Sequence, residues 1–187
     1  MGETSRIAEA LLNIRAVALS LDPPFTWVSG IRSPIYCDNR LLISHPAERT
    51  LVVDRFVEQI EAMPVKPDVI AGTATSGIPF AAWVADRLNL PMVYVRAAKK
   101  EHGKGKAIEG HLASGAKALV IEDLISTGKS SVAVVHHLKD AGAEVIGVLA
   151  IFSYEMAKAA ATFADVNLEP QPLETISSLL KLAVDRG

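Results

Sequence analysis

Hydrophobic residues recur at helical spacing near the start of the chain and in short runs further along it. The apolar residues of Ser5–Leu19 return every three or four positions, which predicts an amphipathic helix. Asp22-Pro23-Pro24 ends this pattern, because proline cannot continue a helix. Two extended segments are predicted next, at Phe25–Val28 and Pro34–Cys37, with a turn at Ser29-Gly30 between them.

From Pro46 onward, apolar runs of strand length alternate with segments of helical periodicity. The predicted elements are a helix from Pro46 through Ile60, strands at Asp68–Gly72, Met92–Val95, Ala118–Ile121 and Val145–Phe152, and helices at Ile78–Leu88, Ser130–Ala141 and Tyr154–Phe163. Strands that alternate with helices indicate parallel pairing in an α/β sheet. The apolar, β-branched character of these strands is typical of a sheet that is covered on both faces.

Two segments differ from this alternating pattern. Residues 1–45 precede it and are predicted to form a small N-terminal helix and lobe, which leaves residues 46–187 as the α/β core. Residues Ala97–Leu112 contain many lysines and glycines and almost no large apolar side chain. A stretch of this length without a pattern is predicted to be a functional or mobile loop.

Composition and charge exclude several classes of function. The chain has 187 residues, half of them hydrophobic, and a net charge of -2, which argues against a general nucleic-acid-binding protein. No apolar stretch has the length of a membrane span, and the N-terminus has no secretory pattern. Cys37 is the single cysteine, so we expect a reducing, cytoplasmic location and a packed or partly exposed free thiol. The histidines form no zinc-binding cluster with cysteines or carboxylates.

The strongest chemical signal is the segment Ala118–Ser131, with the sequence ALVIEDLISTGKSS. It joins an apolar strand, the adjacent acids Glu122 and Asp123, a hydroxyl-rich glycine turn and a helix. Free backbone N–H groups at such a turn, aided by the helix dipole, bind phosphate. Phosphate would repel the two carboxylates, so sugar hydroxyls, or a sugar held with hydrated Mg²⁺, are their expected partners. Alone, the turn is also compatible with an ordinary, well-capped αβ connection.

Two further segments carry weaker signals of the same kind. Ala71–Pro79 follows a strand and opens a helix with small residues, which suits either an anion site or a plain βα turn. Arg96–Lys106 is strongly basic and would neutralise charge on a leaving group and exclude water. It is equally compatible with a solvated basic loop, although it has no aromatic residues for stacking on single-stranded nucleic acid.

The segment Ala118–Ser131 resembles the phosphoribosyl diphosphate signature of type I phosphoribosyltransferases, which implies an α/β fold with a parallel sheet flanked by helices, a small hood and a mobile catalytic loop. The resemblance implies that Glu122 and Asp123 bind the ribose hydroxyls, and that the turn Ser126–Ser130 encloses the 5-phosphate. The substrate-binding residues implied in this segment are Glu122, Asp123, Leu124, Ile125, Ser126, Thr127, Gly128, Lys129 and Ser130. Lys129 stands where the family more often has a small residue, so its role is open.

The spacing Arg96-x-x-x-Lys100-x-His102 resembles the catalytic loop of orotate phosphoribosyltransferases. The resemblance implies that these three residues contact the diphosphate, with Lys100, His102 and Asp123 as the catalytic groups. In that family the loop acts on the neighbouring subunit's site, which implies a homodimer with shared active sites. Mg²⁺ is expected to bind mainly through the substrate, without protein ligands.

Phe25–Arg40 resembles the N-terminal hood of bacterial orotate phosphoribosyltransferases, which narrows the acceptor base to orotate. The implied reaction joins orotate to the ribose of phosphoribosyl diphosphate and yields orotidine 5'-monophosphate in UMP biosynthesis. Basic residues that some relatives carry near Val28, at Ser76 and near Tyr154 are absent here. Orotate recognition is therefore expected to depend on Ser126 and on backbone groups of the hood.

Three other functions are alternatives to this prediction. A purine phosphoribosyltransferase would share the enzyme class and differ in the hood. A regulator that uses the same fold to bind nucleic acid would need an added module or a broad basic face, neither of which the sequence contains. A P-loop nucleotidase is excluded because the Gly-x-x-x-x-Gly-Lys-Ser/Thr spacing is missing.

Overall fold

The computed structural model describes residues 4–20, 22–27, 30–97 and 107–186. A central sheet has six strands in the order β10-β9-β8-β5-β6-β7. These strands are β5 (Val69–Thr73), β6 (Met92–Val95), β7 (Ile108–Glu109), β8 (Lys117–Ile125), β9 (Glu144–Ser153) and β10 (Gln171–Thr175). All neighbours pair in parallel except β7, which pairs antiparallel with β6.

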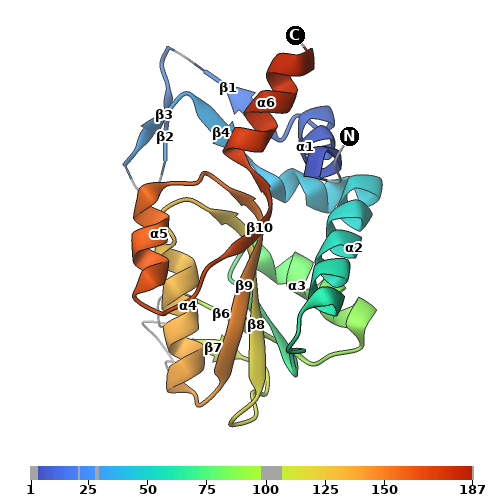
Figure 1. The fold of residues 1–187 in the computed structure, drawn as a ribbon, viewed down its shortest axis with the longest axis vertical. Helices are drawn as coiled ribbons and strands as arrows, with labels where there is room; N and C mark the ends of the chain where they lie inside the picture. Colours follow the sequence, from blue (N-terminus) through green and yellow to red (C-terminus); the bar gives the residue numbers. More distant parts are fainter. Residues whose placement is uncertain (1–3, 21, 28–29, 98–106, 187) are drawn as a thin grey trace.

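Helices cover the two faces of this sheet (Figure 1). The helices α2 (Pro46–Ala62) and α3 (Gly77–Leu88) lie on one face, and α4 (Lys129–Asp140) and α5 (Ala157–Ala164) lie on the other. Each face has its own apolar core. Along β8, Leu119 and Ile121 belong to the core under α2 and α3, whereas Ala118 and Val120 belong to the core under α4 and α5. The predicted two-faced burial of the strands is therefore confirmed.

The N-terminal region forms small strands at one end of the molecule. It contains α1 (Thr4–Asn13), β1 (Val17–Leu19), β2 (Phe25–Thr26), β3 (Arg32–Ser33), β4 (Ile35–Cys37) and the 3₁₀ helix η1 (Asn39–Ser44). β1 pairs with β4, and β2 pairs with β3. We call these four strands the hood. Figure 1 shows the hood at the same end as the last helix, α6 (Ile176–Arg186), which directly follows β10.

The predicted helix at Ser5–Leu19 is wrong in its second half. The helix ends at Asn13, and Arg15 has the left-handed φ of 57°. The Ala16 N–H donates to the Leu11 carbonyl, and the residues after it pair with β4 instead of continuing the helix. Long-range pairing overrides the helical periodicity here, because Val17 suits a strand as well as a helix.

Two other boundaries differ from prediction at the functional end of the sheet. β8 continues to Ile125, so both acids of the 118–131 segment lie within the strand rather than after it. α5 begins at Ala157, later than the predicted start at Tyr154, because the Tyr154 N–H donates to the Ile125 carbonyl and Glu155 has a φ of 51°. β10 and α6 were not predicted.

The division of the chain at residue 45 stays a prediction about folding units. In the structure α1 packs against α2, α6 and β10, and its apolar side chains share the core under α2 and α3. No helix among the described residues is both long and apolar enough to cross a bilayer.

Candidate active site

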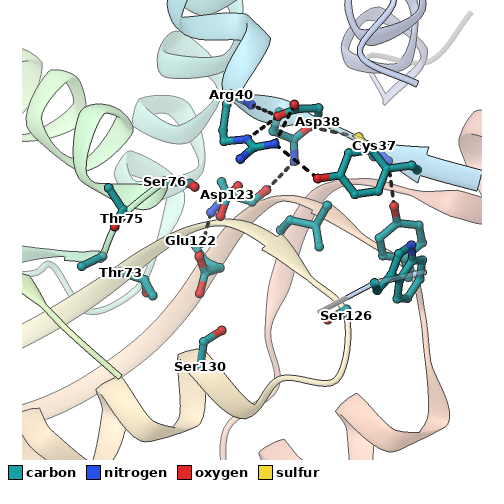
Figure 2. A pocket seen from close by; sticks show the side chains of 16 residues that line it. Cys37, Asp38, Arg40, Thr73, Thr75, Ser76, Glu122, Asp123, Ser126 and Ser130 are labelled. Atoms are coloured by element: carbon teal, nitrogen blue, oxygen red, sulfur yellow. Dashed lines mark hydrogen bonds and ion pairs between the residues drawn. The ribbon is translucent and has the colours of Figure 1, made fainter. Parts of the chain in front are cut away.

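A cavity of about 310 Å³ lies between the hood and the carboxyl ends of β5 and β8. This is the edge of a parallel sheet at which ligands bind in open α/β folds. Three groups of residues line it. The first is Thr73–Ser76, at the end of β5 and in the loop after it. The second comes from β8, the turn after it and α4, and the third lies around the hood: Glu122, Asp123, Leu124, Ser126 and Ser130; and Trp27, Tyr36–Arg40 and Tyr154. Figure 2 shows the acidic pair between the β5 loop and the hood residues.

The acidic pair is held by its own strand and by α4. Glu122 is 3% exposed, and its Oε2 accepts a hydrogen bond from the Ser131 hydroxyl at 2.9 Å. Its Oε1 accepts the backbone N–H of Asp123 at 3.1 Å. Burial, and then the negative charge of Asp123, raise the pKa of Glu122. Burial also raises the pKa of Asp123, so the pair favours holding a proton.

The hydroxyl-rich turn places some of its predicted residues in the cavity and others outside it. Ser126 and Ser130 line the cavity. Gly128 has a φ of 76°, and a Cβ there would lie 3.0 Å from the Phe163 ring, so the turn needs glycine. Thr127 and Ile125 are buried, and Lys129 is exposed; none of these three lines the cavity.

The loop after β5 brings backbone close to the acidic strand. A Cβ on Gly77 would lie 2.6 Å from the Ile121 carbonyl oxygen, so glycine lets the start of α3 approach β8 beside Glu122. The Thr73 hydroxyl is buried at the end of β5 and has no hydrogen-bond partner among the described residues. Ala74 and Thr75 are joined by a cis peptide bond.

Two hydrogen bonds fasten the hood and η1 to the sheet. The Tyr154 hydroxyl accepts a hydrogen bond from the backbone N–H of Cys37 at 2.8 Å. The centroids of the Tyr154 and Trp27 rings lie 4.3 Å apart. The buried Asn39 side chain donates from Nδ2 to the Asp123 carbonyl at 2.7 Å. These contacts join residues more than eighty positions apart in the chain and set the position of the hood above the acidic pair.

A charged pair lies at the rim of the cavity, beside a buried thiol. The Arg40 guanidinium donates to both Asp38 oxygens, at 2.6 and 2.8 Å, and to the Tyr36 hydroxyl at 3.3 Å. The Arg40 guanidinium lowers the pKa of Asp38. Cys37 is 3% exposed, and burial raises the pKa of its thiol to about 12, so the predicted free thiol is packed rather than partly exposed.

The predicted basic loop is only partly within the described residues. Arg96 lies at its start and donates to Glu109 at 2.8 Å, and it does not line the cavity. The Arg96 N–H donates to the Ala107 carbonyl, which brings the two ends of the loop together. Lys100 and His102 fall among residues 98–106, outside the described residues, so their roles stay predictions.

Comparison with known proteins identifies the family. The phosphoribosyl transferase domain family matches residues 43–171. An orotate phosphoribosyltransferase from Coxiella burnetii is 49% identical over 187 residues, which cover 100% of this chain and 90% of that protein. One from Bacillus caldolyticus is 54% identical over 181 residues, which cover 97% of this chain and 87% of that protein. The chain belongs to the orotate phosphoribosyltransferase family.

A solved structure agrees with this family in fold. The UMP synthase of Leishmania donovani superposes with a TM-score of 0.84 at 29% identity. The match covers 99% of this chain and 39% of that longer one. The predicted type I phosphoribosyltransferase fold, a mostly parallel sheet flanked by helices, is confirmed.

The sequence of this orotate phosphoribosyltransferase family member did not single out three cavity residues, although Asn39 and Thr73 lie within segments that it marked as candidate sites. Asn39 and Tyr154 fasten the hood, and Thr73 presents its hydroxyl at the end of β5. Their signal in the sequence is weak, because each is a single polar residue at the end of an apolar element. A polar residue directly after a buried strand is the pattern that would have found Tyr154 and Thr73.

Proposed function

We propose that this protein transfers the phosphoribosyl group of phosphoribosyl diphosphate to orotate, giving orotidine 5'-monophosphate and diphosphate in UMP biosynthesis. One observation carries the proposal. The acidic pair and the hydroxyl-rich turn at the end of β8 share a cavity with three aromatic residues in and beside the hood, Trp27, Tyr36 and Tyr154. A phosphorylated sugar suits the first part of this cavity, and a flat base suits the second.

The sugar phosphate is assigned to the end of β8. The ribose hydroxyls donate to Glu122 and Asp123, whose oxygens are acceptors when ionised. The 5-phosphate accepts hydrogen bonds from the turn Ser126–Ser130, where the first N–H groups of α4 and the helix dipole favour an anion. The unpartnered Thr73 hydroxyl is a further donor for the diphosphate side of the substrate.

The base is assigned to the hood side of the cavity. Trp27, Tyr36 and Tyr154 present aromatic rings there, which suit a flat heterocycle. The Ser126 hydroxyl is the proposed polar contact to orotate. With no lysine near Val28 and no arginine near Tyr154, backbone groups of the hood supply the remaining donors.

The proposed reaction is a displacement at the anomeric carbon. The orotate ring nitrogen attacks as the bond to diphosphate breaks, and positive charge develops on the ribose. Asp123 lies in the cavity wall and stabilises that charge while it holds a hydroxyl. Lys100 and His102 neutralise the departing diphosphate, and Arg96 assists them. Positioning and electrostatics supply the acceleration, so no covalent enzyme intermediate is needed.

Mg²⁺ fits this site as an ion that the substrate carries. No group of three or more histidines, cysteines and carboxylates suited to a metal occurs among the described residues. Mg²⁺ keeps much of its water shell and binds substrate phosphates readily. When bound, it would neutralise part of the diphosphate charge. The open cavity beside two carboxylates accommodates such a substrate, and we name no protein ligand to the ion.

A homodimer with shared active sites and a cytoplasmic location complete the proposal. The loop residues of one subunit would serve the cavity of the other, as in the family that the basic loop resembles. Mixing the separately inactive Lys100→Ala and Asp123→Asn proteins tests this, since random exchange of subunits restores about a quarter of the intact sites. No recovery after subunit exchange would contradict shared sites.

A free cysteine without a disulfide partner supports a cytoplasmic location, which cell fractionation tests.

A spectrophotometric assay tests the reaction itself. Orotate, phosphoribosyl diphosphate and Mg²⁺ are mixed with the protein, and loss of orotate absorbance is followed. Parallel reactions replace orotate with adenine or hypoxanthine. We expect turnover when orotate is the base and none with adenine or hypoxanthine. Turnover of a purine but not of orotate would show that the base is misassigned. No turnover of any base would refute the proposed phosphoribosyltransferase activity.

A further inference from the structure

A buried hydrogen bond from α4 to the acidic pair has no role in the reaction described above. Ser131 lies in the first turn of α4 and is 0% exposed. Its hydroxyl donates to Glu122 Oε2 at 2.9 Å, and the Asp123 N–H donates to Oε1. The protein therefore holds both oxygens of Glu122, one from the helix and one from its own strand. Ser131 itself does not line the cavity.

We propose that Ser131 is a positioning residue, which orients the Glu122 carboxyl group for the ribose hydroxyls and favours its ionised form. The inference rests on the proposed function, because it concerns how the same site binds phosphoribosyl diphosphate. It concerns a residue that reaches the substrate only through Glu122.

The physical reason is the burial of Glu122. A carboxylate with 3% exposure has almost no water to stabilise its charge, so its protein donors decide whether it ionises. The Ser131 hydroxyl favours the ionised form, whereas burial and the charge of Asp123 oppose it. Without the hydroxyl, Oε2 loses its donor, and the carboxyl group keeps its proton to a higher pH. A protonated Glu122 accepts hydrogen bonds from the sugar less well.

The other groups around Glu122 do not replace this donor. Asp123 on β8 opposes the ionisation of Glu122 through its charge and through a side-chain hydrogen bond, and Arg40 of η1 acts on Asp123. The residues that the β5 loop adds to the cavity are uncharged: Thr73, Ala74, Thr75 and Ser76. On the α4 side, the Ser131 hydroxyl donates the hydrogen bond to Glu122. Loss of that hydroxyl therefore shifts the titration of Glu122 in one direction, upward.

The test compares Ser131→Ala, Ser131→Cys and Ser131→Thr. For each variant, kcat/KM for phosphoribosyl diphosphate is measured from acidic to alkaline pH. We expect Ser131→Ala to move the acidic limb upward by about one to two pH units, the size of a lost hydrogen bond to a charged group. The loss should shrink at alkaline pH, where Glu122 ionises in every variant. Ser131→Thr keeps the hydroxyl and restores the limb, and Ser131→Cys keeps the volume with a weak donor and resembles alanine.

A matched control separates positioning from packing. Val135→Ala removes a buried side chain from the same helix without touching Glu122, so it should lower the unfolding temperature and leave the pH profile in place. If Ser131→Ala does not fold, Ser131→Cys decides the question. An acidic limb that stays at its wild-type position in folded Ser131→Ala or Ser131→Cys would overturn the proposal.

A second measurement keeps this proposal separate from the reaction. Carboxyl ¹³C NMR of labelled glutamate follows the titration of Glu122 in the protein alone, with Glu122→Gln identifying its signal. A higher pKa of Glu122 in Ser131→Ala than in the wild type supports the role of the hydrogen bond, and an unchanged pKa refutes it. Either result holds whether or not the protein turns over orotate. A wild-type protein without orotate turnover would reject the proposed function, while the NMR result would still stand.

Discussion

Replacing Tyr154 by phenylalanine should loosen the hood while leaving the fold intact. The change removes the hydroxyl that accepts the Cys37 N–H at 2.8 Å, and it keeps the ring that packs on Trp27 and Phe152. An amide that loses its partner in a partly buried place costs about 1–3 kcal/mol. If this cost falls on the docked hood alone, the open state becomes about 5- to 150-fold more populated.

Alkylation of Cys37 measures this opening directly. Cys37 is the single cysteine of the chain, is 3% exposed, and has a thiol pKa raised to about 12, so reagents reach it mainly after local opening. We expect labelling of the native Tyr154→Phe protein to be faster than wild type by about 5- to 150-fold. The KM for orotate should rise in the same variant, because the hood covers the base.

Tyr94→Phe is the control, since it removes a hydroxyl on β6 that contacts Arg96 and lies outside the cavity. It should leave the labelling rate unchanged. Global unfolding of each variant is measured with urea, so that opening of the hood is separated from unfolding of the whole chain. A labelling rate in Tyr154→Phe equal to that of wild type would refute the idea that this hydroxyl fastens the hood.

Three further predictions concern charged residues. Asp123→Asn should lower kcat/KM for phosphoribosyl diphosphate about 100-fold, because a charge that stabilises the transition state is lost; a normal rate in the orotate assay would remove Asp123 from the mechanism. Lys100→Ala should lower kcat by a similar factor of about 100 and change the free energy of unfolding by less than about 0.5 kcal/mol. An unchanged kcat would exclude Lys100 from the mechanism. The pKa of Glu122 rises from 4.5 to about 8 on folding, so the folded protein binds this proton more tightly than the unfolded chain. The contribution of Glu122 to stability therefore falls as pH rises from 4.5 to about 8, and Glu122→Gln should reduce the loss of stability between these values in urea titrations, whereas an identical loss would contradict the raised pKa.

The α/β core was predictable because its signals are local. Runs such as Val69–Thr73 and Met92–Val95 are mostly apolar, and a chain buries such runs in a sheet covered on both faces. β10 escaped prediction because its sequence, QPLET, has a single large apolar residue. It forms an edge strand through its pairing with β9, and a pairing partner is not visible in a short segment.

The candidate site divides in the same way. Glu122, Asp123, Ser126 and Ser130 stand in one continuous segment, so their grouping follows from chain order and from the rule that ligands bind at the carboxyl ends of parallel strands. Lys129 belongs to the same segment but does not line the cavity, because the helical turn directs neighbouring side chains in different directions. Spacing alone does not distinguish Lys129 from Ser130.

Local patterns of apolar, acidic and small residues were enough to indicate the fold class, the sugar-phosphate segment and the family, because each of these is encoded within a few consecutive residues. The tertiary structure alone decided that the hood closes over this segment through Tyr154 and Asn39, and that Ser131 contacts Glu122. Those contacts join separate elements, and their hydrogen bonds form only once the packed sheet has brought the elements together.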